Sequence, residues 1–77
     1  MKSRIAISNP RKAEQAVEDW NVKFLIGVPV EVTLDDGSLK ETHTVSEAWV
    51  LGGHTAVIKL AGISGAYALS RVHPYRL

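Results

Sequence analysis

The 77-residue sequence contains no cysteine. Disulfide bonds, which hold many small secreted domains together, are therefore excluded, and a zinc site would lack its commonest structural ligand. No apolar run approaches the roughly 20 residues of a membrane span, and residues 1–7 hold no apolar segment long enough for a signal peptide. We therefore expect a cytoplasmic protein without membrane contact or cofactor, stabilised by packing alone.

The net charge is also small, because the charges of nine Lys and Arg residues are nearly balanced by those of eight Asp and Glu residues. A formal charge of +1 gives little attraction to nucleic acid. The composition, 45% hydrophobic and 22% charged, is that of a globular domain. We predict a single domain over residues 9–77 with a small core. Residues 1–8 form an N-terminal arm, either loose or added to a sheet as a strand.

Two apolar runs flank the Gly52-Gly53 pair between residues 48 and 60. Glycine adopts positive φ at little steric cost, so the pattern predicts an antiparallel hairpin at the centre of the fold. Trp49 lies in this hairpin, and we predict that it belongs to the core together with Trp20. His54 follows the turn, where its ring is expected to bond a loop carbonyl and hold the hairpin in place.

Residues 10–21 have the apolar spacing of an amphipathic helix. Asn9 is a suitable cap, and Pro10 fits the first helical position because its missing N–H would have no partner there. A helix this short is marginal alone in water, so its apolar stripe is expected to dock on a sheet. The stripe consists of Ala13, Ala16, Val17, Trp20 and Phe24.

Residues 28–34 alternate between apolar and polar side chains, which predicts a half-buried strand. Residues 35–38 form a tight turn in which the Asp side chains bond their own backbone. The return strand, from 39 to about 51, has an awkward phase, because charged and large apolar residues share one side. A bend or bulge near Ser46-Glu47 would let its two halves serve different faces. The charged side holds Glu41, His43, Val45, Glu47, Trp49 and Leu51; the other holds Thr42, Thr44, Ser46, Ala48 and Val50.

The remaining pattern predicts a strand over about 56–60, a short strand over 66–69, one helical turn at 70–72 and an edge strand at 73–77. Short strands with frequent turns are typical of a sandwich or a barrel, and the length favours the barrel. We therefore predict a mainly β (α+β) fold, in which an N-terminal amphipathic helix precedes a small antiparallel barrel of five strands.

This order of elements resembles the SH3-like small barrels. Four motifs also resemble a group of short, mostly uncharacterised proteins that tailed phages and prophages encode. The resemblance covers most of residues 13–75 and implies a phage or prophage origin; it carries over no activity and no binding residues. The motifs are Trp20-Asn21, Gly27-x-Pro29-Val30, Ser46-x-Ala48-Trp49-x-Leu51-Gly52-Gly53-His54-Thr55 and Ala68-Leu69-x-x-Val72.

No catalytic or metal site is predicted. Ser64 lacks the spacing of a nucleophile elbow, and Asp35-Asp36 lacks the further acidic residues of a calcium loop, so both belong to turns. The Gly52-Gly53 pair leads into a strand, whereas phosphate loops lead into a helix. A metal site would need the fold to gather histidines that the sequence keeps apart, with Glu41 or Glu47. Those histidines are His43, His54 and His73.

We interpret the chain as a non-enzymatic interaction module that binds a protein partner, such as a host factor in host machinery or defence. Self-association is a further expectation, because one small core cannot enclose every large apolar side chain. The candidate contact residues, each of which could instead complete the core, are Val50, Val57, Ile63, Tyr67 and Tyr75. The alternative is a nucleic-acid-binding accessory protein, whose basic termini, otherwise simply solvated, are Arg4, Arg11, Lys12, Arg71 and Arg76.

Overall fold

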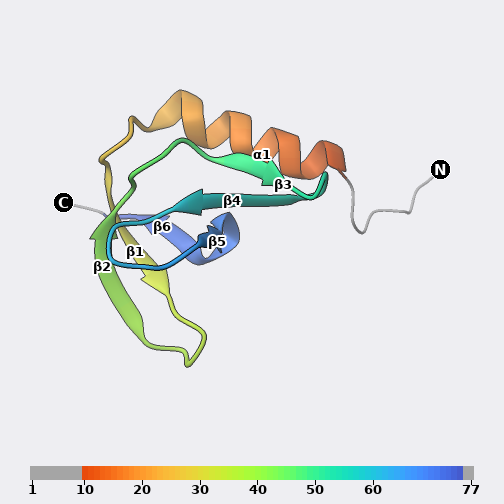
Figure 1. The fold of residues 1–77 in the computed structure, drawn as a ribbon. Coiled ribbons are helices and arrows are strands. Elements are labelled where there is room, and N and C mark those ends of the chain that lie inside the picture. Colours follow the sequence, from red (N-terminus) through yellow and green to blue (C-terminus); the bar gives the residue numbers. More distant parts are fainter. Residues whose placement is uncertain (1–9, 76–77) are drawn as a thin grey trace.

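The structure, a computed structural model, describes residues 10–75, so the predicted N-terminal arm lies outside the described residues (Figure 1). A single α-helix is followed by short strands and one 3-10 turn. The elements are α1 (Pro10–Lys23), β1 (Pro29–Thr33), β2 (Leu39–His43), β3 (Trp49–Leu51), β4 (Thr55–Lys59), β5 (Ala66–Ala68), η1 (Leu69–Arg71) and β6 (Val72–Pro74).

The strands form two antiparallel three-stranded sheets, with the orders β2-β1-β6 and β3-β4-β5. The fold is therefore mainly β with one helix, as predicted. Between residues 10 and 75 the hydrogen bonding defines six strands in two sheets and no closed barrel, so the predicted five-stranded barrel is not what this part of the chain shows.

Helix α1 begins at Pro10 as predicted and continues two residues beyond the predicted end. Its inner side packs against β3 and β4, where Trp20 is only 8% exposed and lies with its ring centroid 4.4 Å from that of Phe24. The Phe24 N–H still donates to the Trp20 carbonyl, at 2.9 Å, and the helix stops there. The predicted docking of the helix on a sheet is confirmed.

The long return strand bends between residues 44 and 48, and its two halves enter different sheets as β2 and β3. Thr44 pairs with Leu60 at the crossing, and the Val45 N–H donates to the Lys59 carbonyl at 3.0 Å. Thr44 is buried, and its hydroxyl accepts the Gly27 N–H at 2.9 Å. The predicted bend near Ser46-Glu47 is confirmed, and it is the point at which the chain passes between the sheets.

Side chains keep one alternation through the whole bend. From residue 41 to 51 every odd-numbered residue is exposed, while every even-numbered residue is buried or half-buried. The buried positions Thr44 and Ala48 are small, and the exposed ones include Trp49. The prediction that Trp49 belongs to the core is therefore wrong, because its position faces outward with the charged residues.

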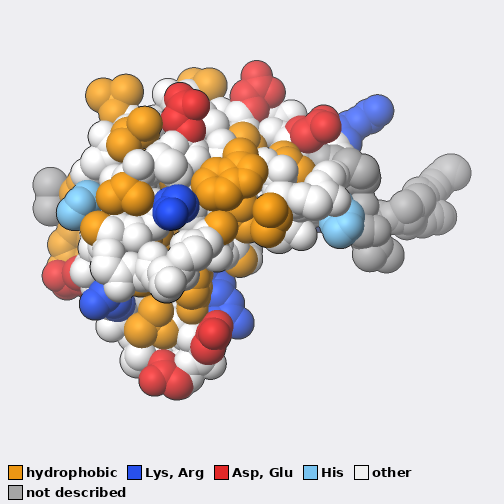
Figure 2. All heavy atoms as spheres, viewed as in Figure 1, with side chains coloured by type: hydrophobic (Ala, Val, Ile, Leu, Met, Phe, Trp, Pro, Cys, Tyr) orange, Lys and Arg blue, Asp and Glu red, His pale blue; other side chains and the backbone are white. Residues whose placement is uncertain are grey.

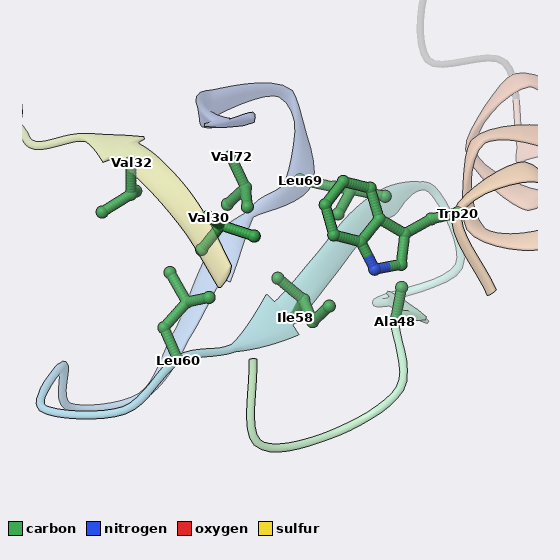
Figure 3. Close-up of a cluster of buried hydrophobic side chains, with 8 residues drawn as sticks. All are labelled: Trp20, Val30, Val32, Ala48, Ile58, Leu60, Leu69 and Val72. Atoms are coloured by element: carbon green, nitrogen blue, oxygen red, sulfur yellow. The ribbon is translucent and has the colours of Figure 1, made fainter. Parts of the chain in front are cut away.

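One hydrophobic core lies between the two sheets and the helix. Figure 3 shows Trp20 reaching from α1 into this cluster, where Val30 comes from one sheet and Ile58 from the other. Both Val30 and Ile58 are completely buried. The sheets therefore depend on the same core and form one packed unit. The cluster consists of Trp20, Val30, Val32, Ala48, Ile58, Leu60, Leu69 and Val72.

The C-terminal segment returns the chain to the first sheet. The predicted helical turn is η1, one residue earlier than expected, and β6 runs antiparallel to β1 at the sheet edge. The Tyr75 N–H donates to the Pro29 carbonyl at 3.0 Å and extends this pairing. The predicted edge strand over 73–77 is thus found over residues 72–74, and its last two predicted residues lie outside the described range.

Candidate functional site

The five contact residues predicted from the sequence do not form one surface. Val57 is 3% exposed, so it is unavailable for contact in the chain as folded, and its register partner on β3 is Trp49. Ile63 and Tyr67 pack against the core, and Val50 is half-buried. Tyr75 alone of the five is exposed. For Val57, Ile63 and Tyr67 the alternative explanation, that they complete the core, describes their position.

Large apolar side chains are exposed elsewhere, first at the end of α1. Val22 is 79% exposed and Leu25 is 86% exposed, and Ile26 beside them is also largely in solvent. We call these three residues the helix-end patch. Figure 2 shows hydrophobic side chains standing out from the molecular outline above α1. None of the three belongs to the core stripe of the helix, because Val22 lies two residues beyond Trp20 and the helix ends at Lys23.

The backbone holds the helix-end patch in a defined turn. The Val28 N–H donates to the Leu25 carbonyl at 3.2 Å, and Gly27 has a φ of 102°. A four-residue turn with positive φ at its third position is the type II arrangement, which favours glycine there. The Gly27 N–H also donates to the buried Thr44 hydroxyl. Leu25 and Ile26 therefore stand on a turn that is tied to the core.

A second exposed apolar surface lies on the outer side of the β3–β4 hairpin. It contains Val45, Trp49 and Leu51, with Glu47 and Lys59 beside them, and we call these five residues the hairpin face. Trp49 pairs in register with Val57 and Leu51 with Thr55. Figure 2 shows hydrophobic side chains gathered where Figure 1 places β3 and β4, with a basic side chain next to them.

Asn21 fixes the strand that carries this surface. Its side-chain Nδ2 donates to the Ala48 carbonyl at 3.1 Å, and its Oδ1 accepts the Ala48 N–H at 2.9 Å. The amide thus pairs with the backbone of Ala48 as a neighbouring strand would, immediately before Trp49. These two bonds join the Trp20-Asn21 motif to the Ala48-Trp49 motif that the sequence singles out.

The outer side of the β2-β1-β6 sheet is mainly polar, apart from the exposed Leu39 at the start of β2. Glu31 is paired in register with Glu41 on one side and with His73 on the other. The Tyr75 hydroxyl donates to Glu41 Oε2 at 2.6 Å. This hydrogen bond, the negative charge of Glu41, partial desolvation and the charge of Glu31 raise the pKa of Tyr75 above its usual 10.0. One cross-strand hydrogen bond therefore links Tyr75 to Glu41, while Glu31 and Glu41 are neighbouring like charges.

A smaller polar cluster closes the end of the β1–β2 turn. Asp35 Oδ1 accepts hydrogen bonds from the Tyr67 hydroxyl at 3.2 Å and from Arg71 at 3.3 Å. Asp35 and Arg71 are solvent-exposed enough that such a pair contributes little to stability. Hydrogen bonds from the Ser38 hydroxyl and backbone N–H to the Asp36 carboxylate lower the pKa of Asp36 below its usual 3.8. The turn chemistry predicted for Asp36 is present, whereas Asp35 bonds side chains from the C-terminal segment.

No metal site is found among residues 10–75, since no group of three or more His, Cys, Asp or Glu side chains is placed to hold an ion. His43, His54 and His73 are all exposed. The His54 backbone N–H donates to the Leu51 carbonyl at 3.4 Å, but its ring bonds no loop carbonyl in the described structure. The predicted role of the ring is wrong; the positive φ of Gly52 and Gly53 forms the turn.

The basic residues considered for nucleic acid are separated. Arg11 and Lys12 lie in the first turn of α1, whereas Arg71 lies in η1 and is paired with Asp35. Arg4 and Arg76 lie outside the described residues. Within the described part of the chain, no helix has the length and apolar character needed to cross a membrane.

Comparisons with protein-family models, with curated proteins and with solved structures gave no match. The function is therefore inferred from the two apolar surfaces. Sequence reasoning missed both, although a signal was present: Trp49 shares its phase with Glu47, and Val22 lies off the helix stripe. At Trp49 and Val22, the position of the residue in the alternation of its strand or the stripe of its helix indicated its exposure better than its hydrophobicity did.

Proposed function

We propose that this chain is a non-enzymatic interaction module that binds a protein partner through the helix-end patch. One observation carries the proposal: Leu25, the most exposed large apolar residue of the described chain, stands beside Val22 on a structured turn. Clustered apolar side chains that a folded domain leaves in solvent are typical of interaction sites.

The energetics favour contact at this patch. Covering a large aliphatic side chain that was exposed stabilises a complex by about 1.5–3 kcal/mol. Because the type II turn already fixes the backbone of Leu25 and Ile26, little backbone entropy is lost on binding. Three such side chains at the end of one helix and on the turn that follows it are enough to form the centre of a small interface.

The shape of the patch indicates the chemistry of the partner. Val22, Leu25 and Ile26 project from a helix end and a turn, so they form a convex surface. A convex apolar surface fits an apolar groove on another protein. It does not fit a nucleic-acid backbone, which recruits Lys and Arg.

The resemblance to phage and prophage proteins supports a host protein as this partner, in the cytoplasm of the host cell. Modulation of host machinery or defence is the role that we propose for the complex. The SH3-like fold is likewise a proposal: a bent strand shared by two sheets, a 3-10 turn before the last strand, and pairing of the first and last strands all support it.

The test compares Leu25→Asp with Leu39→Asp. Leu39 is also exposed, but it lies on β2, away from the patch, so its variant is the matched control. Host proteins captured by the wild-type chain are identified, purified and titrated by calorimetry. We expect one-to-one binding that Leu25→Asp weakens at least tenfold and Leu39→Asp leaves unchanged.

Equal binding by both variants would overturn the proposal for this patch. A chain that captures no protein partner but binds RNA or DNA, with affinity that falls log-linearly with salt, would overturn it in favour of the nucleic-acid alternative. Circular dichroism of each variant verifies that the fold is intact before binding is compared.

A further inference from the structure

We infer that the hairpin face binds a second copy of this chain in a symmetric dimer. The inference does not rest on the proposed function, because the helix-end patch is a different surface. In the dimer, the outer sides of the two β3–β4 hairpins pack face to face, around a two-fold axis that runs parallel to the strands and between them.

The centre of this surface is apolar. Trp49 is 36% exposed and stands beside the buried Val57, its register partner on β4, on the same side of the sheet. Leu51 lies two residues further along β3, on the same side of the sheet. Because about two thirds of the Trp49 surface is already removed from solvent, a second copy needs to cover only the remaining exposed part.

The two charges of the hairpin face have opposite signs and lie at the same end of the hairpin. Glu47 comes two residues before β3, and Lys59 is the last residue of β4. Ser46 holds the two backbones together there: its Oγ accepts the Lys59 N–H at 3.2 Å and donates to the Glu47 carbonyl at 2.8 Å. Within residues 10–75 neither side chain forms an ion pair.

The two-fold symmetry then places each charged or apolar side chain of one copy opposite a complementary side chain of the other copy. Rotation about an axis parallel to β3 and β4 keeps the end of the hairpin but exchanges the strands, so β3 of one copy lies over β4 of the other. Glu47 of each copy thereby approaches Lys59 of its partner copy. Trp49 meets the Trp49–Val57 pair of the other copy, and Leu51 meets its Thr55. The face is therefore complementary to itself, as an isologous interface requires.

This self-complementarity distinguishes a second copy from other occupants. A nucleic acid would be repelled by Glu47, and the helix-end patch, which has no acidic member, cannot pair its charges in this way. The face comprises only the short strands β3 and β4, so it buries less than the ~800 Å² per partner of a standard interface. We therefore expect a weak dimer that forms at high protein concentration.

The test exchanges the two charges on the full chain. E47K brings two lysine side chains together at each charge pair, and K59E brings two glutamate side chains together, so each variant alone dimerises at least tenfold more weakly than the wild type. The double variant E47K/K59E restores both pairs and dimerises within about threefold of the wild type. Sedimentation equilibrium over micromolar to millimolar concentrations measures each constant.

Mixing the two single variants gives a stricter result. An E47K chain carries lysine at both positions and a K59E chain carries glutamate at both, so in this arrangement they form two lysine–glutamate pairs and the heterodimer recovers an affinity within about threefold of the wild type. Native mass spectrometry measures the heterodimer fraction. Trp49→Ser is expected to abolish dimerisation, and Leu25→Asp, on the helix-end patch, to leave it unchanged.

A wild-type chain that stays monomeric at millimolar concentration, or a dimer unaffected by either charge change, would overturn the inference and leave the proposed function standing. A mixture of E47K and K59E in which the heterodimer is no stronger than the two homodimers would also overturn it, because the proposed arrangement gives that heterodimer two lysine–glutamate pairs.

Discussion

The outer sides of the two sheets differ in how their side chains are used. On β2-β1-β6, Glu41 accepts a hydrogen bond from Tyr75 across the sheet, and Glu31 faces His73. On β3-β4-β5, Trp49 and Leu51 stand in solvent. Both sheets have three short antiparallel strands and share one core. A hydrogen bond links two outer side chains of the first sheet, on which Leu39 is also exposed, whereas the outer side of the β3–β4 hairpin is mainly apolar.

The change from one character to the other occurs along a single stretch of chain. After Leu39, the exposed odd-numbered residues of β2 are polar, at Glu41 and His43, and from the bend onward they are mainly apolar, at Val45, Trp49 and Leu51. The bend carries the stretch from one sheet into the other without changing which residues face outward. The outer side chains of the two sheets can therefore differ in chemistry while the buried side chains of both sheets form the same core.

The largest expected effect is on stability, and it compares a substitution in the shared core with one on the outer side of the same strand. Ile58 and Lys59 are neighbours on β4, but Ile58 is completely buried and Lys59 is exposed. Ile58→Ala should lower the free energy of unfolding by about 2–5 kcal/mol, because it removes core contacts and leaves a cavity. Lys59→Ala should change it by less than about 0.5 kcal/mol. Urea denaturation followed by circular dichroism measures both.

A single transition in the wild type, seen alike by tryptophan fluorescence and circular dichroism, is also expected. Two separate transitions would mean that the sheets unfold independently, so their outer sides could not be compared as two surfaces of one cooperative unit.

A smaller effect tests how the apolar outer side is held. Asn21→Ala leaves both the N–H and the carbonyl of Ala48 without their partner. We expect a loss of about 1–3 kcal/mol in the free energy of unfolding, since unpaired backbone groups in a partly buried position are costly. Gln15→Ala removes an exposed hydrogen bond to Asp19 on the same helix and serves as the control. Equal losses for the two variants in thermal unfolding would contradict a special role for Asn21.

The smallest effect concerns the polar outer side and is seen in alkali. The pKa of Tyr75 is raised, chiefly by its hydrogen bond to Glu41, so the folded chain holds this proton more tightly than the unfolded chain does. The resulting stability is fully present below the unfolded pKa, near 10.0, and is lost as pH rises through the higher folded value. Tyr75→Phe should remove this part of the alkaline loss.

Absorbance titration of the phenolate measures the pKa directly. Glu41→Gln weakens the hydrogen bond that chiefly raises the pKa of Tyr75 and removes the negative charge behind it, so this pKa should move down toward 10.0 in that variant. A Tyr75 pKa that is the same in the wild type and in Glu41→Gln would show that the contact across the sheet does not persist in solution.

Local patterns predicted most of the fold. Pro10 marks the start of the helix, Gly52-Gly53 marks the hairpin, and the mixed phase of residues 39–51 marks the bend. Each of these signals acts within a few residues, through dihedral preference or side-chain alternation, and so it is readable without the rest of the chain.

The candidate sites were not predictable in the same way. Residue type assigns Trp49 to the core, because tryptophan is usually well buried, and alternation assigns Val57 to the surface, opposite the buried side of its strand. In the structure Val57 is buried although its register partner Trp49 faces outward, and Ile58 next to it is buried as well, so β4 is buried on both sides at its centre. Such burial depends on which strands become neighbours, and that is decided by contacts distant in sequence.

The unbroken alternation from residue 41 to 51 makes the segment sensitive to parity. Removing or adding one residue between Thr44 and Ala48 would turn Trp49 toward the core and Val50 toward solvent, so the buried and exposed side chains of β3 would exchange places. Removing or adding two would keep every side chain on its own side. Variation in the length of this crossing is therefore expected in even steps.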